Sequence, residues 1–595
     1  MTIDLARAQT VGAAFLERAA EHPEKTALTI YRGSTATEHP SRTYAELARR
    51  AGRRAEELMS RLAPGERVLI SLPTCCEFVE IYLACMLAGL VAVPMPPLVG
   101  SSTTTAAERV ALVAGDCRPG LAFTTPGDKE ALAERLRSHG LGNVPVEEPG
   151  DIGPDEVPTA LLPGRNVSSD TLAVLQYSSG STGSPKGVML DHGHILANLA
   201  ALRAFACLGT PDDSFGSWMP LHHDFGLFAQ LTTALIHGVH TVLMSPTEFV
   251  KRPVEWFRMM DRFGTTVTSA PNFAFGLCLR LIRDQQLEGL DLSALSCIIN
   301  GSEPIHAPMM AAFAKRFASI GLRPEAYMLG YGMAETTVYV SGTPRDKEPR
   351  VLVVDPRQAE SAENPRLVET MGGAGKEIVS VGTPGAHETR IVDPQTLRTL
   401  PDGAIGEIWL RGSSIGRGYW DKPELSEQTF QAHLADDPDD APGWLRTGDL
   451  GAVLGGDLFV TGRLKELVIV RGRNLYPHDL EQQARLANAA LEGFVGAAFG
   501  VAAPDERVVL VHEVDPRVLA EDLPAVAADV MRELTAFFGV PVRNVMLVRR
   551  GTVRRTTSGK IQRRAMRERF LAGGIPALHS VLEPDIRRLT AVDAQ

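Results

Sequence analysis

Short apolar runs alternate with amphipathic stretches over the first 140 residues of the chain. The apolar runs predict strands at residues 26–31, 67–72, 90–93 and 121–124. Apolar positions three or four residues apart predict helices at residues 10–22, 43–62, 77–88, 106–114 and 129–138. Strands that alternate with helices are typical of an α/β architecture with a largely parallel sheet. We therefore predict a large layered amino-terminal domain with mixed or parallel sheets and helices.

The carboxyl-terminal part of the chain has a different pattern. Apolar runs at residues 495–499 and 508–514 predict strands, and residues 524–538 have helical spacing. Between Arg543 and Arg569 there are ten Arg or Lys residues against one acid, Glu568. This part is predicted to form a small α+β domain with a strongly basic segment.

The composition fits a folded protein of at least two domains, with 595 residues, 44% hydrophobic and 22% charged. A net charge of -11 argues against overall nucleic-acid binding. The seven cysteines include no C-x-x-C pair, so we expect neither zinc nor disulfides, as in a reduced, cytoplasmic protein. The most apolar segment, residues 81–98, is broken by prolines, and no membrane span is expected.

A phosphate-binding loop is predicted between the apolar runs 172–177 and 187–190. The loop contains only Ser, Gly, Thr, Pro and Lys, namely Ser178, Ser179, Gly180, Ser181, Thr182, Gly183, Ser184, Pro185, Lys186 and Gly187. Small residues let backbone N–H groups and hydroxyls surround a phosphate, and Lys186 adds a positive charge. The loop departs from the common NTPase pattern, because Lys186 is followed by Gly187 instead of Ser or Thr. A flexible linker is the alternative, but linkers rarely contain Thr-Gly-Ser-Pro-Lys-Gly between two apolar runs.

The stretch YSSGSTGSPKGV resembles the phosphate-binding signature of the adenylate-forming superfamily. That superfamily contains acyl-CoA synthetases, luciferases, peptide-synthetase adenylation domains and fatty acyl-AMP ligases. The resemblance extends over roughly residues 10–570, with the motifs in family order. It implies activation of a carboxylic acid by ATP and Mg²⁺ to an acyl-adenylate, with a mobile carboxyl-terminal lid.

Two motifs match the nucleotide site of this family. The turn INGSEPI resembles its adenine-binding turn, which assigns Gly301, Ser302 and Glu303 to adenine, although such a turn alone is a weak signal. The stretch YGMAETT offers the ring of Tyr331 for adenine stacking and the carboxylate of Glu335 for Mg²⁺, together with Thr182. Its remaining predicted nucleotide contacts are Gly332, Met333, Ala334 and Thr336, the last through its hydroxyl to the α-phosphate.

Three later motifs complete the predicted site. Asp449, in the stretch WLRTGD, resembles the carboxylate that accepts both ribose hydroxyls, and Arg463 can reach ribose or phosphate. Lys465 stands where the family has its hinge, so we place the domain boundary there, giving domains 1–465 and 466–595. The stretch TTSGK resembles the final motif of the family and makes Lys560 the catalytic lysine.

The stretch WMPLHHDFGL, residues 218–227, holds two adjacent histidines and an aspartate. If it is a strand, His222 and His223 point to opposite faces, which argues against their sharing a metal ion. The stretch resembles the family's Pro-Leu-aromatic-His motif, which implies that His223 gates the substrate pocket. His222 departs from that motif, because an aromatic residue usually stands there.

An acyl tunnel is predicted from apolar residues on both sides of this motif. The segment SAPNFAFGLC resembles a wall of the family's acyl tunnel, although Phe, Trp and Met residues usually only fill a core. The predicted tunnel residues are Trp218, His222, Asp224, Ala270, Asn272, Phe273 and Phe275. A pocket for an amino acid would be shorter and would need a carboxylate for the ammonium group, for which Asp224 is the candidate.

The amino-acid sequences of several segments resemble those of fatty acyl-AMP ligases most closely. These ligases have an insertion, at about residues 341–380 here, that is thought to hinder the domain movement needed for coenzyme A; a variable surface loop is the alternative. The expected partner is an acyl carrier protein supplied in trans, which accepts the acyl group on its phosphopantetheine thiol. The basic segment 543–569 fits docking of an acidic carrier better than nucleic-acid binding, because it has few aromatic residues.

Two other hypotheses remain. The chain could be an acyl-CoA, aryl or amino-acid ligase of the same fold. It could also be a nucleotide-binding protein without activity, although the set Thr182, Glu335, Asp449, Arg463 and Lys560 is intact.

Overall fold

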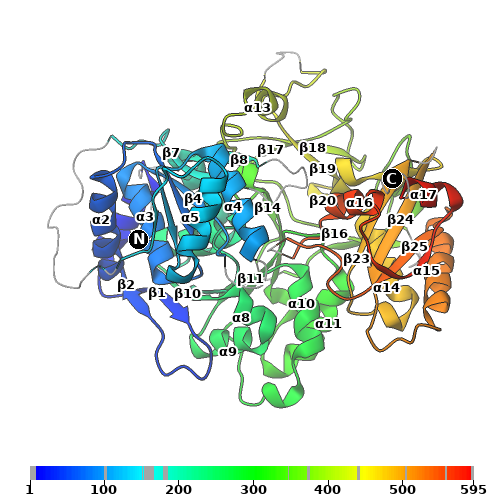
Figure 1. The fold of residues 1–595 in the computed structure, drawn as a ribbon, viewed down its shortest axis with the longest axis horizontal. Helices are drawn as coiled ribbons and strands as arrows, with labels where there is room; N and C mark the ends of the chain where they lie inside the picture. The colour runs from blue at the N-terminus through cyan, green and yellow to red at the C-terminus, as the bar shows by residue number, and fades with distance from the viewer. Residues whose placement is uncertain are drawn as a thin grey trace.

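Two largely parallel sheets dominate the amino-terminal part of the molecule (Figure 1). The structure is a computed structural model that describes residues 9–98, 103–150, 152, 166–177, 185–345, 347–370, 375–437, 442–502, 505–556 and 559–590. The first sheet has the spatial order β6 (Val146–Glu147), β5 (Leu121–Thr124), β3 (Arg67–Ser71), β4 (Val91–Pro94), β7 (Leu172–Tyr177) and β8 (Gly187–Asp191). The second has the order β14 (Ser341–Gly342), β13 (Tyr327–Tyr331), β12 (Cys297–Asn300), β11 (Val267–Ala270), β9 (Ser214–Ser217), β10 (His240–Met244), β1 (Thr26–Tyr31) and β2 (Ser41–Thr43). In the described part of these two sheets the edge pairs β1–β2, β7–β8 and β13–β14 are antiparallel and the other pairs are parallel, which agrees with the largely parallel sheet expected from the sequence.

Alternate residues of one strand enter different cores, as the pleat of a strand requires. Val68 and Ile70 of β3 belong to a large core shared by both sheets, whereas Leu69 packs in a smaller core with α4 and α5. The helices of the amino-terminal part are α1 (Val11–Glu21), α2 (Tyr44–Met59), α3 (Cys76–Ala88), α4 (Thr103–Cys117), α5 (Lys129–Ser138), α6 (His192–Ala206), α7 (Thr233–Ile236), α8 (Pro246–Lys251), α9 (Val254–Arg262), α10 (Asn272–Leu281) and α11 (Ala307–Phe317). At the start of α2, the Thr43 and Glu46 side chains form the predicted capping box.

A smaller antiparallel sheet connects the two large sheets to the carboxyl-terminal part. Its order is β17 (Glu388–Val392), β18 (Gly406–Arg411), β19 (Leu445–Leu454) and β20 (Asp457–Arg463), and α13 (Pro423–Phe430) lies between β18 and β19 in the chain. The segment predicted as an insertion forms α12 (Pro356–Ala359) and a two-stranded sheet of β15 (Val351–Val354) and β16 (Lys376–Val379).

The carboxyl-terminal elements gather on one side of the molecule, coloured orange to red in Figure 1. After the hairpin β21 (Val468–Val470) and β22 (Arg473–Leu475), one sheet forms in the order β23 (Gly496–Ala502), β24 (Glu506–Glu513), β25 (Asn544–Val548) and β26 (Ala577–Val581). The helices described beside it are α14 (Pro477–Ala487), α15 (Leu523–Phe538), α16 (Arg563–Leu571) and α17 (Pro584–Leu589). Ala498 faces a core with α14 and α15, and the neighbouring Ala497 faces another with α16. None of the helices in the described part of the chain combines the length and the apolar character needed to cross a bilayer.

Candidate active site

The predicted phosphate-binding loop joins β7 to β8. Its residues Ser178, Ser179, Gly180, Ser181, Thr182 and Gly183 lie outside the described residues. Both ends are described, and Tyr177 and Gly187 pair in register across the loop. Burial lowers the pKa of Lys186, and the nearby charges of Lys465 and Lys422 lower it further. The negative charge of Glu335 acts in the opposite direction and raises it. A group of positive charges therefore surrounds the place where phosphates are expected.

Glu335 lies in the short 3-10 turn η6 (Ala334–Thr336) that follows β13. Gly332 makes this turn possible, since a Cβ there would lie 1.7 Å from the carbonyl oxygen of Val338. Oε1 of Glu335 accepts a hydrogen bond of 2.8 Å from the Tyr419 hydroxyl, and among the described residues Oε2 has no hydrogen-bond partner. Mg²⁺ is commonly held by one or two carboxylates with substrate phosphates and water, so this single carboxylate fits it.

Met333, Ala334 and Thr336 form the rest of the turn. Thr336 is fully buried, and its hydroxyl donates to the carbonyl of Met333 at 3.0 Å. The hydroxyl already has this partner, and its predicted contact with the α-phosphate stays a prediction. Thr336 instead fixes the turn, because its own carbonyl accepts a hydrogen bond from Asn198 Nδ2 at 2.9 Å.

Asp449 sits at the centre of a small polar network at the start of the β19–β20 ladder. It is 5% exposed, and its Oδ2 accepts from the Tyr331 hydroxyl at 2.8 Å. Its Oδ1 lies 2.9 Å from Nε of Arg463, which is the cross-strand partner of Asp449. Burial and the Asp449 charge together hold the pKa of Tyr331 far above its usual range. Three predicted nucleotide residues therefore meet, and each carboxylate oxygen keeps a second lone pair for a ribose hydroxyl.

The predicted adenine turn follows β12. Gly301 is buried, and Ser302 has a φ of 72°, a left-handed conformation that few non-glycine residues adopt. Glu303 accepts a hydrogen bond from the backbone N–H of Phe273. Burial raises the pKa of Glu303 to about 7, although that hydrogen bond and the charge of Lys560 act in the opposite direction. The Glu303 side chain is thus directed toward α10 and Lys560.

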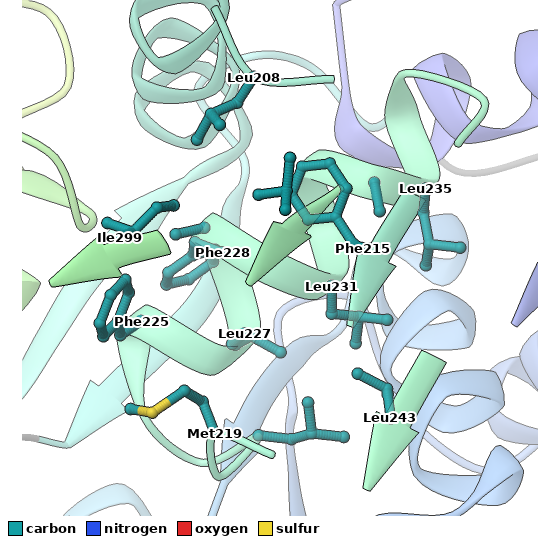
Figure 2. Close-up of a cluster of buried hydrophobic side chains, with 14 of the residues drawn as sticks. Leu208, Phe215, Met219, Phe225, Leu227, Phe228, Leu231, Leu235, Leu243 and Ile299 are labelled. Atoms are coloured by element: carbon teal, nitrogen blue, oxygen red, sulfur yellow. The ribbon is translucent and has the colours of Figure 1, made fainter. Parts of the chain in front are cut away.

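The His-His-Asp segment is not a strand, contrary to the assumption made from its sequence. Residues 218–223 form a turn that enters the π-helix η2 (Phe225–Thr232), which is completely buried. Figure 2 shows how Phe225, Leu227, Phe228 and Leu231 of this π-helix pack into a cluster of apolar side chains. All eight residues of η2 are buried, and only Gln230 and Thr232 among them have polar side chains, so the pattern identifies neither a strand nor a helix. π-Helical turns occur frequently at functional sites.

The turn and the start of η2 place His223 and Asp224 together. Nδ1 of His223 lies 2.8 Å from Oδ1 of Asp224, which also accepts the N–H of Phe225 at 2.8 Å. Burial raises the pKa of Asp224, but the hydrogen bond and charge of His223 outweigh it and bring the pKa below its usual value. Burial lowers the pKa of His222 to about 3, so its ring is neutral. Within the described residues, no group of three or more His, Cys, Asp or Glu could hold a metal ion.

The predicted acyl-tunnel residues form two groups. Trp218 is stacked on Phe249, with ring centres 3.9 Å apart, and meets Trp256 and Phe273 edge to face. The indole N–H of Trp218 is buried and has no hydrogen-bond partner among the residues that the structure describes. The second group, Ala270, Asn272 and Phe275, is buried around the start of α10, where the Phe275 ring packs against Phe313 and Tyr327 as in an ordinary core.

The described part of the carboxyl-terminal loop, which includes Gly559 and Lys560, reaches the amino-terminal part. A Cβ on Gly559 would lie 2.6 Å from Cε1 of Phe273, so the loop backbone is pressed against α10. Burial lowers the pKa of Lys560, while the charges of Asp224, Asp449 and Glu303 raise it and that of Arg463 lowers it. Lys560 therefore lies among predicted residues of both the nucleotide and the acyl site.

The segment predicted as an insertion contacts the chain just after Lys465. Glu360 forms an ion pair with Arg473, and the backbone N–H of Asn474 donates to the Glu360 carbonyl at 2.7 Å. Lys376 forms an ion pair with Asp479, and its Nζ lies 4.8 Å from the centre of the Tyr476 ring. We refer to these two ion pairs, Glu360–Arg473 and Lys376–Asp479, together as the 360–479 latch.

Sequence reasoning missed Tyr419, although it lies in the segment GRGYW. Its hydroxyl binds Glu335, and the Nζ of Lys186 lies 5.3 Å from the centre of its ring. A Gly-Tyr-Trp turn carries no chemical signature of its own, so only the three-dimensional contacts identify it.

Comparison with known protein families gives one match that covers most of the chain. The profile of the AMP-binding enzyme family matches residues 15–420. A long-chain-fatty-acid–AMP ligase, FadD26 of Mycobacterium bovis, is 36% identical over 580 residues, which cover 94% of this chain and 97% of that protein. The medium-chain-fatty-acid–[acyl-carrier-protein] ligase JamA of Moorena producens is 35% identical over 544 residues, or 90% of both chains.

Among solved structures, one from studies of fatty acyl-adenylate ligases of E. coli and L. pneumophila superposes with a TM-score of 0.84. It is 28% identical in sequence, and the alignment covers 96% of this chain and 99% of that one. The layered α/β fold and the smaller carboxyl-terminal unit predicted from sequence are therefore confirmed.

Proposed function

Because this chain belongs to the AMP-binding enzyme family and is related over nearly its whole length to fatty-acid–AMP ligases, we propose that it activates a medium- or long-chain fatty acid with ATP. The product is the acyl-adenylate, and the acyl group then passes to the phosphopantetheine thiol of a separate acyl carrier protein. The observation that carries the proposal is the position of Lys560, whose ammonium group shares its surroundings with Asp449 and Asp224.

In the first step, a carboxylate oxygen of the fatty acid attacks the α-phosphorus of ATP. The bond to the β,γ-pyrophosphate breaks, and pyrophosphate leaves with the bonding electron pair. Lys560 neutralises charge on the carboxylate and the α-phosphate, and Asp449 and Tyr331 hold the nucleoside. Thr182 and Lys186 would hold the phosphates, and Glu335 and Thr182 would bind a Mg²⁺ ion that would screen the negative charge of the phosphates.

In the second step, the thiol sulfur of the carrier attacks the acyl carbonyl carbon, and AMP leaves. We place the domain boundary at Lys465 and propose that residues 466–595 rotate about it between the two steps, exchanging the groups that face the acyl-adenylate. His223 is proposed to adjust to the substrate carboxylate as this happens. Its hydrogen bond to Asp224 fixes the ring orientation.

A fatty acid fits the site better than an amino acid. The carboxylate of Asp224 already accepts hydrogen bonds from His223 and from the Phe225 backbone. The ammonium group of Lys560 already lies near the Asp224 carboxylate. The ammonium group of an amino-acid substrate would therefore compete with Lys560 for this carboxylate. The aromatic rings around Trp218 form the apolar surface that an alkyl chain requires, at about 0.8 kcal/mol for each buried CH₂ group.

The proposal is tested by ATP–pyrophosphate exchange with a series of straight-chain acids. We expect exchange that depends on medium- or long-chain acids and on Mg²⁺, and transfer of the acyl group to a holo-carrier protein. Absence of exchange with every alkanoic acid would refute the function. Exchange with alkanoic acids and equal transfer to coenzyme A would leave activation intact and refute only the choice of acceptor.

Weakening the 360–479 latch is expected to increase use of free coenzyme A. The latch ties the segment 351–379 to residues that follow the proposed hinge, so it opposes rotation of the lid. The double variant Glu360→Gln and Asp479→Asn keeps the size and shape of both side chains. It removes the negative charge from each of the two ion pairs. We expect thioester formation with coenzyme A to rise about tenfold, equivalent to roughly 1.4 kcal/mol, while the rate of pyrophosphate exchange stays within about twofold.

The control is Glu255→Gln, which weakens another buried carboxylate, bonded to Tyr31 and Ser34 far from the lid. It should lower the melting temperature without changing coenzyme A use. Identical coenzyme A rates in the latch variant and the unaltered protein would show that the latch does not select the acceptor.

Reversing charge at Arg549 and Arg550 is expected to slow transfer to the carrier. Both residues are exposed at the turn after β25. Burial lowers the pKa of Arg280 of α10, and the nearby charge of Arg550 lowers it further. An acidic carrier that docks there would meet positive charge from both domains. Arg549→Glu with Arg550→Glu should reduce the transfer rate about tenfold at low salt, and the difference should shrink as salt screens the charges.

The matched control reverses two other exposed arginines of the same domain, Arg587 and Arg588 of α17. Equal loss of transfer in both double variants would indicate a general charge effect and no defined docking surface. Pyrophosphate exchange, which needs no carrier, should remain unchanged in both.

A further inference from the structure

Tyr419 is fixed by its backbone against the strand that leaves the phosphate-binding loop. The N–H of Met189 donates to the Gly418 carbonyl at 2.9 Å, and the N–H of Trp420 donates to the Gly187 carbonyl at 2.8 Å. Tyr419 itself forms a β-bridge with Val188. Residues 417–420 thus add a short antiparallel segment to β8, the strand that begins directly after Lys186.

The side chain of Tyr419 lies between two groups that the phosphates need. It is 5% exposed, and the Phe430 ring packs edge to face against it with ring centres 5.1 Å apart. Its hydroxyl donates to Oε1 of Glu335 at 2.8 Å, and Nζ of Lys186 lies 5.3 Å from its ring centre, in cation–π range. The backbone carbonyl of Glu335 is also held, by the N–H of Gly416 at 2.9 Å.

Without Tyr419, Lys186 and Glu335 would be free to form a direct ion pair. In the described part of the chain they form none, although the charge of Glu335 raises the pKa of Lys186 against the effect of burial. A direct pair would occupy the carboxylate and the ammonium group with each other and withdraw both from a bound nucleotide. The hydroxyl holds the carboxylate, and the ring face holds the ammonium group, at separate places.

The residues next to Tyr419 brace the other end of the loop. Lys422 Nζ lies 2.5 Å from Oδ1 of Asp116, and Oδ2 of the same carboxylate accepts a 2.5 Å hydrogen bond from the Tyr177 hydroxyl. Tyr177 is the last residue before the loop, and Lys186 is near its end. The segment 417–422 therefore contacts Lys186, Gly187 and Glu335 directly, and it reaches Tyr177 through the carboxylate of Asp116.

We propose that Tyr419 is a positioning residue that keeps the Glu335 carboxylate and the Lys186 ammonium group apart and directed at the same polyphosphate. This inference rests on the proposed function, because ATP and Mg²⁺ are its ligands. Tyr419 would act through Glu335 on the metal requirement and through Lys186 on nucleotide affinity. The hydrogen bond from the hydroxyl to Glu335 and the contact of the ring with Lys186 can be removed separately.

The test compares Tyr419→Phe, which loses only the hydroxyl, with Tyr419→Leu, which also loses the ring. For Tyr419→Phe we expect the Mg²⁺ concentration for half-maximal pyrophosphate exchange to rise about tenfold, because a hydrogen bond to a charged group is lost. The KM for ATP at saturating Mg²⁺ should change less than about threefold. In Tyr419→Leu the KM for ATP should also rise, by about tenfold, as Lys186 loses its aromatic contact.

A second measurement does not depend on turnover. Thermal unfolding is followed with a non-hydrolysable ATP analogue, once with Mg²⁺ and once with chelator. The part of the stabilisation that depends on Mg²⁺ should shrink in Tyr419→Phe, whereas the part seen in chelator should shrink only in Tyr419→Leu. The control is Tyr44→Phe, which removes a buried hydroxyl that donates to the Val239 carbonyl at 2.9 Å, away from the site.

The proposal is overturned if Tyr419→Phe keeps the Mg²⁺ requirement and the Mg²⁺-dependent stabilisation of the unaltered protein. It is also overturned if Tyr44→Phe shifts them equally, since a general loss of stability would then explain both. Should Tyr419→Leu fail to fold, Tyr419→Phe and the control decide the matter. Failure of the proposed function is distinct, because the unaltered protein would then show no exchange at all.

Discussion

Replacing Lys560 by alanine is expected to reduce formation of the acyl-adenylate by about a thousandfold while transfer from supplied acyl-adenylate is largely retained. Burial lowers the pKa of Lys560 in this conformation, and Asp224, Asp449 and Glu303 lie close enough for their charges to oppose that shift. The adenylation step develops negative charge on the α-phosphate, and an ammonium group already in place stabilises it without reorganisation.

The different effects on the two steps follow from the proposed rotation of the lid. The loop that carries Lys560 is held against α10 by the contact between Gly559 and Phe273, and that contact must break when residues 466–595 turn. Lys560 would then face solvent during transfer. Pyrophosphate exchange measures the first step. Transfer of the acyl group from supplied acyl-adenylate to the holo-carrier measures the second step.

Lys315→Ala serves as the control, because Lys315 is an exposed lysine of α11 outside the site. It should leave both steps unchanged. Equal loss of both steps in Lys560→Ala would contradict a role confined to adenylation, and normal exchange in that variant would remove Lys560 from the catalytic site.

The sequence predicted those parts of the fold that depend on local patterns. The alternating strands and helices, and the capping box at Thr43 and Glu46, involve residues close in the chain, whose spacing reports their geometry directly. For the His-His-Asp segment a strand was only assumed, because the buried residues of the π-helix that follows, with Gln230 and Thr232 as the only polar side chains, show neither period. Nothing in the spacing of residues 222–224 indicates a turn.

The candidate site could be predicted as a set of residues but not as a set of contacts. Asp449, Tyr331 and Arg463 were each assigned to the nucleotide, yet their direct bonding to one another depends on strand register and was not foreseen. The hydrogen bond between Tyr419 and Glu335 joins residues 84 positions apart. Interactions at such separations are set by the packing of whole elements, which a single sequence does not reveal.

Asp449→Ala is expected to raise the dissociation constant for ATP about a hundredfold, since two hydrogen bonds from ribose hydroxyls to a carboxylate are worth about 3 kcal/mol together. The geometry explains why the carboxylate is ready for them. A left-handed Gly448 and an irregular register on both sides of β19 turn Asp449 toward Tyr331. Arg463 and Tyr331 each occupy one oxygen, which fixes the carboxylate plane before the nucleotide binds.

Stability should change little in Asp449→Ala, so nucleotide binding can be measured on folded protein. The Arg463 side chain is 56% exposed, and its guanidinium group remains hydrated when its partner is removed. Asp213→Asn is the matched control, because Asp213 pairs with Arg345 at 3.0 Å and is more enclosed. It should lower the melting temperature more than Asp449→Ala and leave ATP affinity unchanged. Calorimetric titration with a non-hydrolysable ATP analogue distinguishes the two, and an unchanged affinity in Asp449→Ala would show that the ribose is held elsewhere.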